Sequence, residues 1–212
     1  MKPILFNTKM VQAILEGRKT TTRRIIKVDN NLDFIGCSSE DGCEFNRAAF
    51  GKGSFDKLLD AEIKERVKAP YMPGDILYVR ETWIIQSMKN FEKNVKFLYK
   101  ARPTKLNEVH VSNKRYEEML KFECKNGWQP SLFMPKEAAR IFLKVTSVKI
   151  ERLQDITEEG IRAEGITEEW PPYAEDKFQE LWDSTTKEYR WRLNPWVWVI
   201  EFKRIEKNEV EQ

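Results

Sequence analysis

Three well-separated segments with the residue pattern of β-strands constrain the fold of this chain most. They are residues 76–83 (ILYVRETW), 138–150 (AARIFLKVTSVKI) and 196–204 (WVWVIEFKR), in which β-branched, aromatic and alternating apolar residues favour strands. The helical patterns are short and cover residues 8–16, 55–67, 113–123, 157–165 and 176–183. Thr8 and Thr157 are the expected N-caps of two of these helices. Short strands with few, short helices predict an α+β fold in which a small β-barrel carries flanking helices.

Two long stretches interrupt this pattern and are interpreted as insertions. Residues 29–68 open with Asn, Asp, Gly and Ser, and residues 84–127 are mixed and polar. The chain has 212 residues, a length that suits one globular domain carrying both insertions. We therefore expect a single domain over residues 1–212.

The cysteine and histidine content narrows the possible chemistry. The chain holds one histidine and three cysteines, and an odd number of cysteines argues against a disulfide framework. Cys37, Cys43, Cys124 and His110 are too loosely spaced for a zinc site. A single histidine also argues against Ser-His-Asp, Cys-His and multi-histidine chemistry. We expect no metal and no cofactor, so Lys, Thr, Ser, Glu, Asp or Tyr would have to move protons.

Membrane contact is not expected. No run approaches the roughly 18 consecutive apolar residues of a membrane span. Charges are spread through the first segment, which lacks the apolar stretch of a signal peptide. We expect a cytoplasmic protein.

Positive charge is concentrated near the start of the chain. Residues 1–30 hold seven basic and two acidic groups, a net charge of +5, against +3 for the whole chain. The focus is GRKTTTRR at residues 17–24, with three threonines and four cations. Like-charge repulsion lowers the pKa of a lysine among guanidinium groups, and such a lysine can activate a hydroxyl. A solvated basic turn is the alternative interpretation.

The segment GRKTTTRR resembles the Gly-x-Lys-x-x-Thr-x-Arg signature of the ASCH domain family, in the PUA-like β-barrel superfamily. Three further segments are similar in the same order: PGDILYVRETW, LKVTSVKIERLQDITEEGIRAEGI and WVWVIEFKRI. The long form with MPKEAARIFL and NPWVWVIEF is similar to ASCH proteins of bacteriophages and prophages, for which the cytoplasm would be that of the host. Residues 29–68 and 84–127 have no counterpart in the compact bacterial members. The resemblance implies a small PUA-like barrel with a cleft for a nucleobase or nucleotide.

The resemblance also implies a reaction. Compact members of the family include an amidohydrolase that removes the acetyl group from 4-acetylcytidine, with a Lys, a Thr and a Glu as base, nucleophile and acid. These roles fall on Lys19, Thr22 and Glu164. The implied activity is a metal-independent amidohydrolase for an acylated pyrimidine nucleoside or nucleotide. Lys19 would take the proton of Thr22, Thr22 would attack the acyl carbonyl, and Glu164 would protonate the leaving nitrogen.

A binding module for RNA or single-stranded nucleic acid is the alternative function, with the same basic cleft and no catalysis. Arg18, Arg23 and Arg24 would contact phosphates. Arg80 shares a strand face with Tyr78 and would contact phosphate or stack on a base, unless it forms a structural ion pair. A nuclease is a third alternative, which needs a metal site that the sequence does not show.

Aromatic residues outside this motif are numerous. Core packing is the expected role of most of the seven tryptophans. Trp83 and Trp128 flank the second insertion and are candidate platforms for base stacking. Lys136 is a further candidate phosphate contact.

Overall fold

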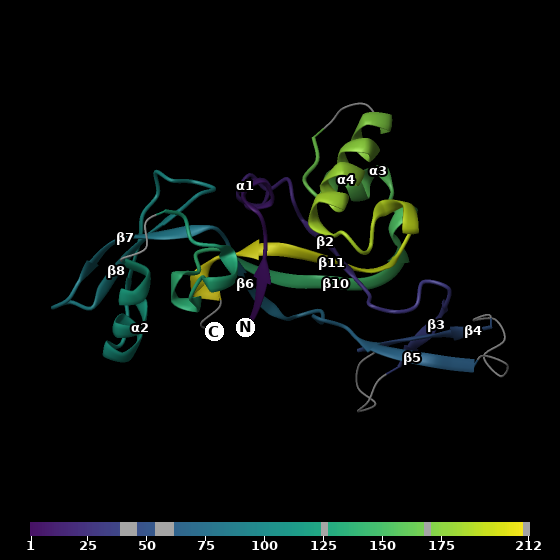
Figure 1. Cartoon of the computed structure of the whole chain (residues 1–212), viewed down its shortest axis with the longest axis horizontal. Helices are drawn as coiled ribbons and strands as arrows, with labels where there is room; N and C mark the ends of the chain where they lie inside the picture. The colour runs from purple at the N-terminus through teal and green to yellow at the C-terminus, as the bar shows by residue number, and fades with distance from the viewer. Residues whose placement is uncertain (39–45, 54–61, 124–126, 168–170, 210–212) are drawn as a thin grey trace. The chain divides into compact units, whose positions relative to one another are not determined.

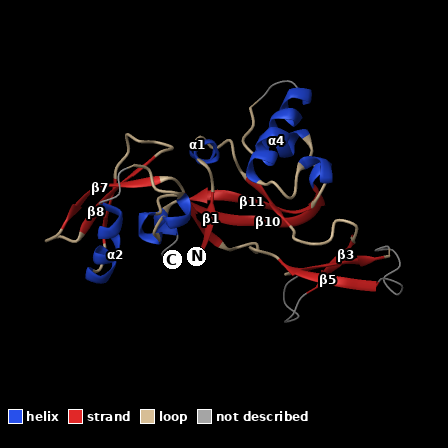
Figure 2. Cartoon of the chain, viewed as in Figure 1, coloured by secondary structure: helices blue, strands red, loops and turns tan. Residues whose placement is uncertain are grey.

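The protein has a mixed α+β fold. The computed structural model describes residues 1–38, 46–53, 62–123, 127–167 and 171–209. In these residues the strands pair into three sheets, accompanied by four α-helices (Figures 1 and 2). None of the described helices is long and apolar enough to cross a membrane.

The chain divides into two compact units. Unit 1 comprises Met1–Arg18, Asp75–Lys144 and Lys203–Gln212, and unit 2 comprises Lys19–Gly74 and Val145–Phe202. The elements of unit 1 are β1 (Lys2–Leu5), α1 (Thr8–Leu15), β6 (Ile76–Arg80), β7 (Trp83–Lys89), β8 (Asn94–Tyr99), β9 (Asn107–His110) and α2 (Asn113–Glu123). The elements of unit 2 are β2 (Thr21–Ile25), β3 (Asp33–Ser38), β4 (Arg47–Lys52), β5 (Glu62–Lys68), α3 (Glu158–Ala163) and α4 (Pro171–Thr185). Strands β10 (Phe142–Arg152) and β11 (Trp196–Ile205) have residues in both units.

The largest sheet has the strand order β1-β6-β10-β11-β2. In unit 1, β1 pairs parallel with β6, and β6 pairs antiparallel with the start of β10. In unit 2, β11 pairs antiparallel with β2. The α+β class expected from the sequence is confirmed. The described strands do not close into the expected barrel, because β1 pairs there with β6 alone and β2 with β11 alone.

Each stretch interpreted as an insertion contains a three-stranded antiparallel sheet. The first holds β3-β4-β5 and the second holds nearly all of β7-β8-β9. The helix predicted over 55–67 is wrong where the structure describes it, since Glu62–Lys68 is strand β5. Its charged composition suits a helix, but pairing with β4 on both sides of a register shift supplies the backbone hydrogen bonds instead. The rest of that prediction lies outside the described residues.

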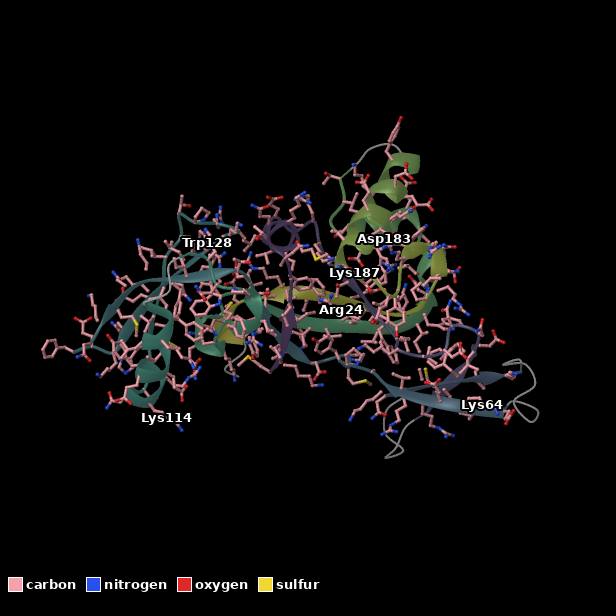
Figure 3. All side chains as sticks on the ribbon, in the orientation of Figure 1. Arg24, Lys64, Lys114, Trp128, Asp183 and Lys187 are labelled. Atoms are coloured by element: carbon pink, nitrogen blue, oxygen red, sulfur yellow. The ribbon has the colours of Figure 1, made fainter. Side chains whose placement is uncertain are left out.

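The core of unit 1 is aromatic. Trp83, Phe97 and Tyr99 are fully buried in a cluster that includes residues of α2. The rings of Trp83 and Phe97 lie 5.8 Å apart between centroids. A ring with no exposed surface cannot stack on a base, so the stacking role predicted for Trp83 is wrong. Trp128, labelled in Figure 3, is 39% exposed by its accessible surface, and its stacking role stays a prediction.

An ion pair is buried beside this core. Glu81 is 1% exposed and accepts hydrogen bonds from Arg140 Nε and Nη2, both at 2.9 Å. The Arg140 guanidinium also lies 4.0 Å from the centroid of the Tyr99 ring. Burial raises the pKa of Glu81, and the hydrogen bonds and charge of Arg140 oppose this shift.

Helix capping shows how local sequence sets the helix starts. Thr157 is the N-cap of α3, as predicted, and its side chain accepts a hydrogen bond from Gly160 N at 3.1 Å. At α1 the cap is Asn7 and not the predicted Thr8, because Asn7 Oδ1 accepts from Met10 N at 2.9 Å. An amide oxygen and a hydroxyl both satisfy a free N–H at a helix start.

Replacing Thr157 with alanine is expected to lower the free energy of unfolding by about 1 kcal/mol, because the Gly160 N–H loses its acceptor. Thr157→Ser keeps the hydroxyl and serves as the matched control. Urea denaturation at neutral pH measures both variants. Equal stability of the alanine and serine variants would contradict the capping role.

Candidate active site

The candidate site begins with a backbone link between two distant segments of unit 2. Lys19 and Glu164 face each other in an isolated antiparallel bridge, just before β2 and just after α3. Thr20 N donates to Ala163 O at 2.9 Å, which holds the two segments together. The structure therefore brings together two of the three residues expected to be catalytic.

Lys19 is the more deeply buried of the two charged residues at this bridge. Its side chain has no exposed surface, and that of Glu164 is 4% exposed. Lys19 Nζ donates to Thr21 O at 2.8 Å and Glu164 O at 3.1 Å, and it forms an ion pair with Glu164 Oε2. These three acceptors match the three N–H donors of an ammonium group. The Lys19 amine is therefore held in a fixed position against the Glu164 carboxylate.

Arg23 and Glu151 extend this pair into a network. Arg23 Nη1 donates to Glu164 Oε1 at 3.2 Å, while Arg23 Nε and Nη2 donate to Glu151 Oε1 at 2.9 and 2.7 Å. We call Lys19, Arg23, Glu151 and Glu164 the Lys19 cluster. Two cations and two carboxylates balance its formal charge, which limits the cost of burying them.

Burial lowers the pKa of Lys19, and this is the largest influence on it. The charge and hydrogen bond of Glu164 act in the opposite direction, while Arg24 and Arg23 add smaller lowering effects. The cations beside Lys19 in the sequence predicted a lowered pKa for this lysine. The direction of this pKa shift agrees with the prediction, but desolvation is its main cause. The spacing of Lys19 from its neighbours in the sequence carries no information on its burial.

Thr22 lies within β2 and is 2% exposed. Its backbone pairs with Ile200 of β11. Because successive strand residues face opposite sides, Thr22 and Arg24 share one face of β2, and Thr21 and Arg23 share the other. Lys19 Nζ binds the carbonyl of Thr21, which belongs to the same peptide group as the Thr22 nitrogen. The predicted nucleophile is thus one peptide group from the predicted base.

A pocket of about 410 Å³ in unit 2 reaches the Lys19 cluster. Arg23 and Glu151 belong both to the Lys19 cluster and to the lining of the pocket, and Thr21 lines the pocket from β2. Its charged lining residues are Arg23, Lys149, Glu151, Asp155, Glu159 and Glu201. The two cations pair with Glu151 and Glu201, so Asp155 and Glu159 leave the lining with net negative charge. This acidic pocket favours a neutral or cationic ligand over a phosphate.

The four arginines expected to bind nucleic acid are divided between the units. Arg18 is exposed in unit 1, where its Nε donates to Glu16 at 2.8 Å. Arg80, also in unit 1, donates from Nε to Met134 O at 3.0 Å. In unit 2, Arg23 is buried against two carboxylates. Arg24, labelled in Figure 3, lies on β2, and burial lowers its pKa.

Sequence reasoning missed Glu151. It lies at the end of β10, beyond the strand predicted over 138–150, and its carboxylate holds the buried Arg23. Neither its neighbours nor its spacing from residues 17–24 distinguishes it from other glutamates, since 128 residues separate it from Arg23.

In the part of the chain that the structure describes, no group of three His, Cys, Asp or Glu side chains could hold a metal ion. Cys37 is exposed in unit 2, and His110 Nδ1 lies 2.8 Å from Glu92 O in unit 1. Cys43 and Cys124, the other cysteines weighed for zinc, lie outside the described residues.

Comparisons with known proteins add one structural likeness. No protein-family model matches the chain, and no curated protein matches it. Among solved structures, protein EF3133 from Enterococcus faecalis V583, described with family model DUF984, is similar with a TM-score of 0.42 and 9% sequence identity. The match covers 97% of this chain and 82% of that one. A proposal on function therefore rests on this chain's own residues.

Proposed function

We propose that unit 2 is a metal-independent amidohydrolase of the ASCH, PUA-like type, acting on an acylated pyrimidine nucleoside. The observation that carries the proposal is the fully buried Lys19, which is paired with Glu164 and lies one peptide group from Thr22. The resemblance of residues 17–24 to the ASCH signature supplies the roles of the residues.

One proton transfer prepares both catalytic groups. When a proton moves from Lys19 Nζ to Glu164 Oε2, the pair becomes a neutral amine and a neutral carboxylic acid. Burial favours this transfer at Lys19, because it lowers the pKa of that amine. The neutral amine is then a general base and the carboxylic acid a general acid.

The reaction then balances with water as the only co-reactant. Thr22 Oγ1 attacks the acyl carbon and gives its proton to Lys19 Nζ. The C–N bond breaks, and Glu164 protonates the leaving amino nitrogen, which leaves an ester on Thr22. Water attacks the ester and gives a proton to Glu164, while Lys19 returns its proton to Thr22 Oγ1. The products are the free nucleoside and a carboxylic acid.

The hydroxyl of Thr22 is expected to be essential. With 4-acetylcytidine as substrate, Thr22→Val should abolish the release of cytidine, followed by chromatography. Thr21→Val is the matched control, since it removes the neighbouring buried hydroxyl from the opposite strand face, and it should retain turnover. If Thr21→Val alone lost turnover, Thr21 and not Thr22 would be the nucleophile. No release by the wild-type protein from any 4-acylated cytidine would refute the proposed function.

The pH dependence of kcat/KM should report Lys19. Its amine acts as a base only when unprotonated, while the acid role of Glu164 requires a proton, so kcat/KM should rise and then fall as the pH increases. Because burial lowers the pKa of Lys19 from 10.5, the fall should begin below that pH. Initial rates across a pH series measure this. A profile that is still rising at pH 10.5 would argue against Lys19 as the base.

A further inference from the structure

A second pocket, of about 430 Å³, lies within unit 1. Its walls come from β6, from α2 and from the 3-10 turns Ser131–Phe133 and Lys136–Ala138. Four basic side chains and one acidic side chain line it: Arg80, Arg115, Lys121, Lys136 and Glu118. We call it the basic pocket. It shares no residue with the acidic pocket of unit 2.

Internal ion pairs leave a positive excess in the basic pocket. Arg115 Nε and Nη2 each donate at 2.8 Å to the carboxylate of Glu137, and Arg115 also pairs with Glu118. The one lining carboxylate is therefore already bound to a lining cation. Arg80, Lys121 and Lys136 supply the remaining charge, and the carbonyl of Met134 holds Arg80 in place at 3.0 Å. This arrangement suits an anion.

Apolar and aromatic surface accompanies this charge. Leu132 and Phe133 are 57% and 55% exposed. Phe122 and Tyr78 are partly buried, and Lys121 Nζ lies 5.3 Å from the centroid of the Phe122 ring. An exposed aromatic ring beside cations is the combination that binds single-stranded nucleic acid, because bases stack on the ring while phosphates meet the cations.

We propose that the basic pocket binds one nucleotide of an RNA or single-stranded DNA, with the base on Phe133 and the phosphate near Lys121, Lys136 and Arg80. Its volume lies within the range of small-molecule sites. A free nucleotide has the same chemistry, a planar base joined to a phosphate. This binding goes beyond the proposed amide hydrolysis and does not depend on it, because Lys19, Thr22 and Glu164 do not line the basic pocket.

Binding of fluorescently labelled decauridylate, measured by anisotropy at two salt concentrations, tests the proposal. Phe133→Ala should weaken binding about tenfold through the loss of stacking. The double variant Lys121→Ala/Lys136→Ala should weaken it at least as much and reduce the slope of log K against log salt by about 1.4. Uridine monophosphate and inorganic phosphate serve as competitors, and circular dichroism checks that each variant is folded.

Matched controls come from exposed residues of unit 1 outside the pocket. Phe91→Ala removes a fully exposed phenylalanine, and Lys100→Ala/Lys105→Ala removes two exposed lysines, so both should bind as the wild type does. Competition by uridine monophosphate would identify a free nucleotide as the ligand. Absence of that competition would identify a nucleic-acid strand as the ligand. Either outcome supports binding at the basic pocket. Lys19→Met should leave binding unchanged, which separates this proposal from the hydrolase.

Three outcomes would overturn the proposal. The first is the absence of saturable binding of either decauridylate or the mononucleotide. The second is competition by inorganic phosphate as effective as that by uridine monophosphate, since this would show charge alone without recognition of a base. The third is equal weakening by the pocket variants and the control variants.

Discussion

Glu164→Gln is expected to reduce kcat for hydrolysis of 4-acetylcytidine by roughly 10²–10⁴-fold. Glutamine keeps the size and a hydrogen-bonding oxygen of the residue that faces Lys19 Nζ, but it cannot carry the proton that the leaving nitrogen requires. Lys19→Met should cause a loss of similar size, because methionine fills the buried space without a basic nitrogen. Single-turnover rates measured by chromatography give the comparison.

Glu158→Gln is the matched control for this loss. Glu158 is an exposed residue of α3 that pairs with Arg162 on the surface, so its replacement should leave turnover unchanged. Urea denaturation shows whether the Glu164 and Lys19 variants are folded under the assay conditions. A folded Glu164→Gln protein with turnover within a few-fold of wild type would remove Glu164 from the mechanism.

Breaking the Glu81–Arg140 pair is expected to have the largest effect on stability. Arg140→Met should lower the free energy of unfolding by about 3–5 kcal/mol, because it leaves the Glu81 carboxylate buried without its cation. The double variant Glu81→Leu/Arg140→Met removes both charges and should recover most of that loss. Chemical denaturation of the two single variants and the double variant gives a double-mutant cycle. A loss below 1 kcal/mol in Arg140→Met would contradict the structural role of this pair.

The same pair should make stability depend on pH. Burial raises the pKa of Glu81, so the folded protein holds this proton at a pH where the unfolded chain has released it. The contribution of Glu81 to stability therefore increases as pH falls through the raised pKa. Without the opposing charge of Arg140 this dependence should grow, so Arg140→Met should lose less stability at pH 5 than at pH 8. Arg162→Met, which breaks an exposed pair, should change stability by less than about 0.5 kcal/mol at either pH.

Local sequence determined the elements whose stabilising contacts are close in the chain. The period of apolar residues predicted β11 nearly to its ends and α1 and α2 within a residue or two. The single strand predicted over 76–83 is wrong at its end, because β6 ends at Arg80 and β7 begins at Trp83. A helix or an alternating strand reveals its buried face through residues only a few positions apart. The segment predicted as one strand from residue 138 starts instead with a 3-10 turn at Lys136–Ala138, and β10 begins at Phe142.

Only the tertiary structure decided what surrounds each chemically active side chain. The position of Glu164 against Lys19 depends on a bridge between residues 145 positions apart, and the role of Glu151 depends on a contact across 128 positions. The assignment of Arg80 to a pocket in unit 1 and of Glu62–Lys68 to a strand depends equally on distant partners. Charge pairing, strand pairing and the burial of individual charged side chains arise from long-range contacts, which local periodicity does not reveal. The motif at residues 17–24 therefore indicated which residues could act, and the folded chain determined which of them meet.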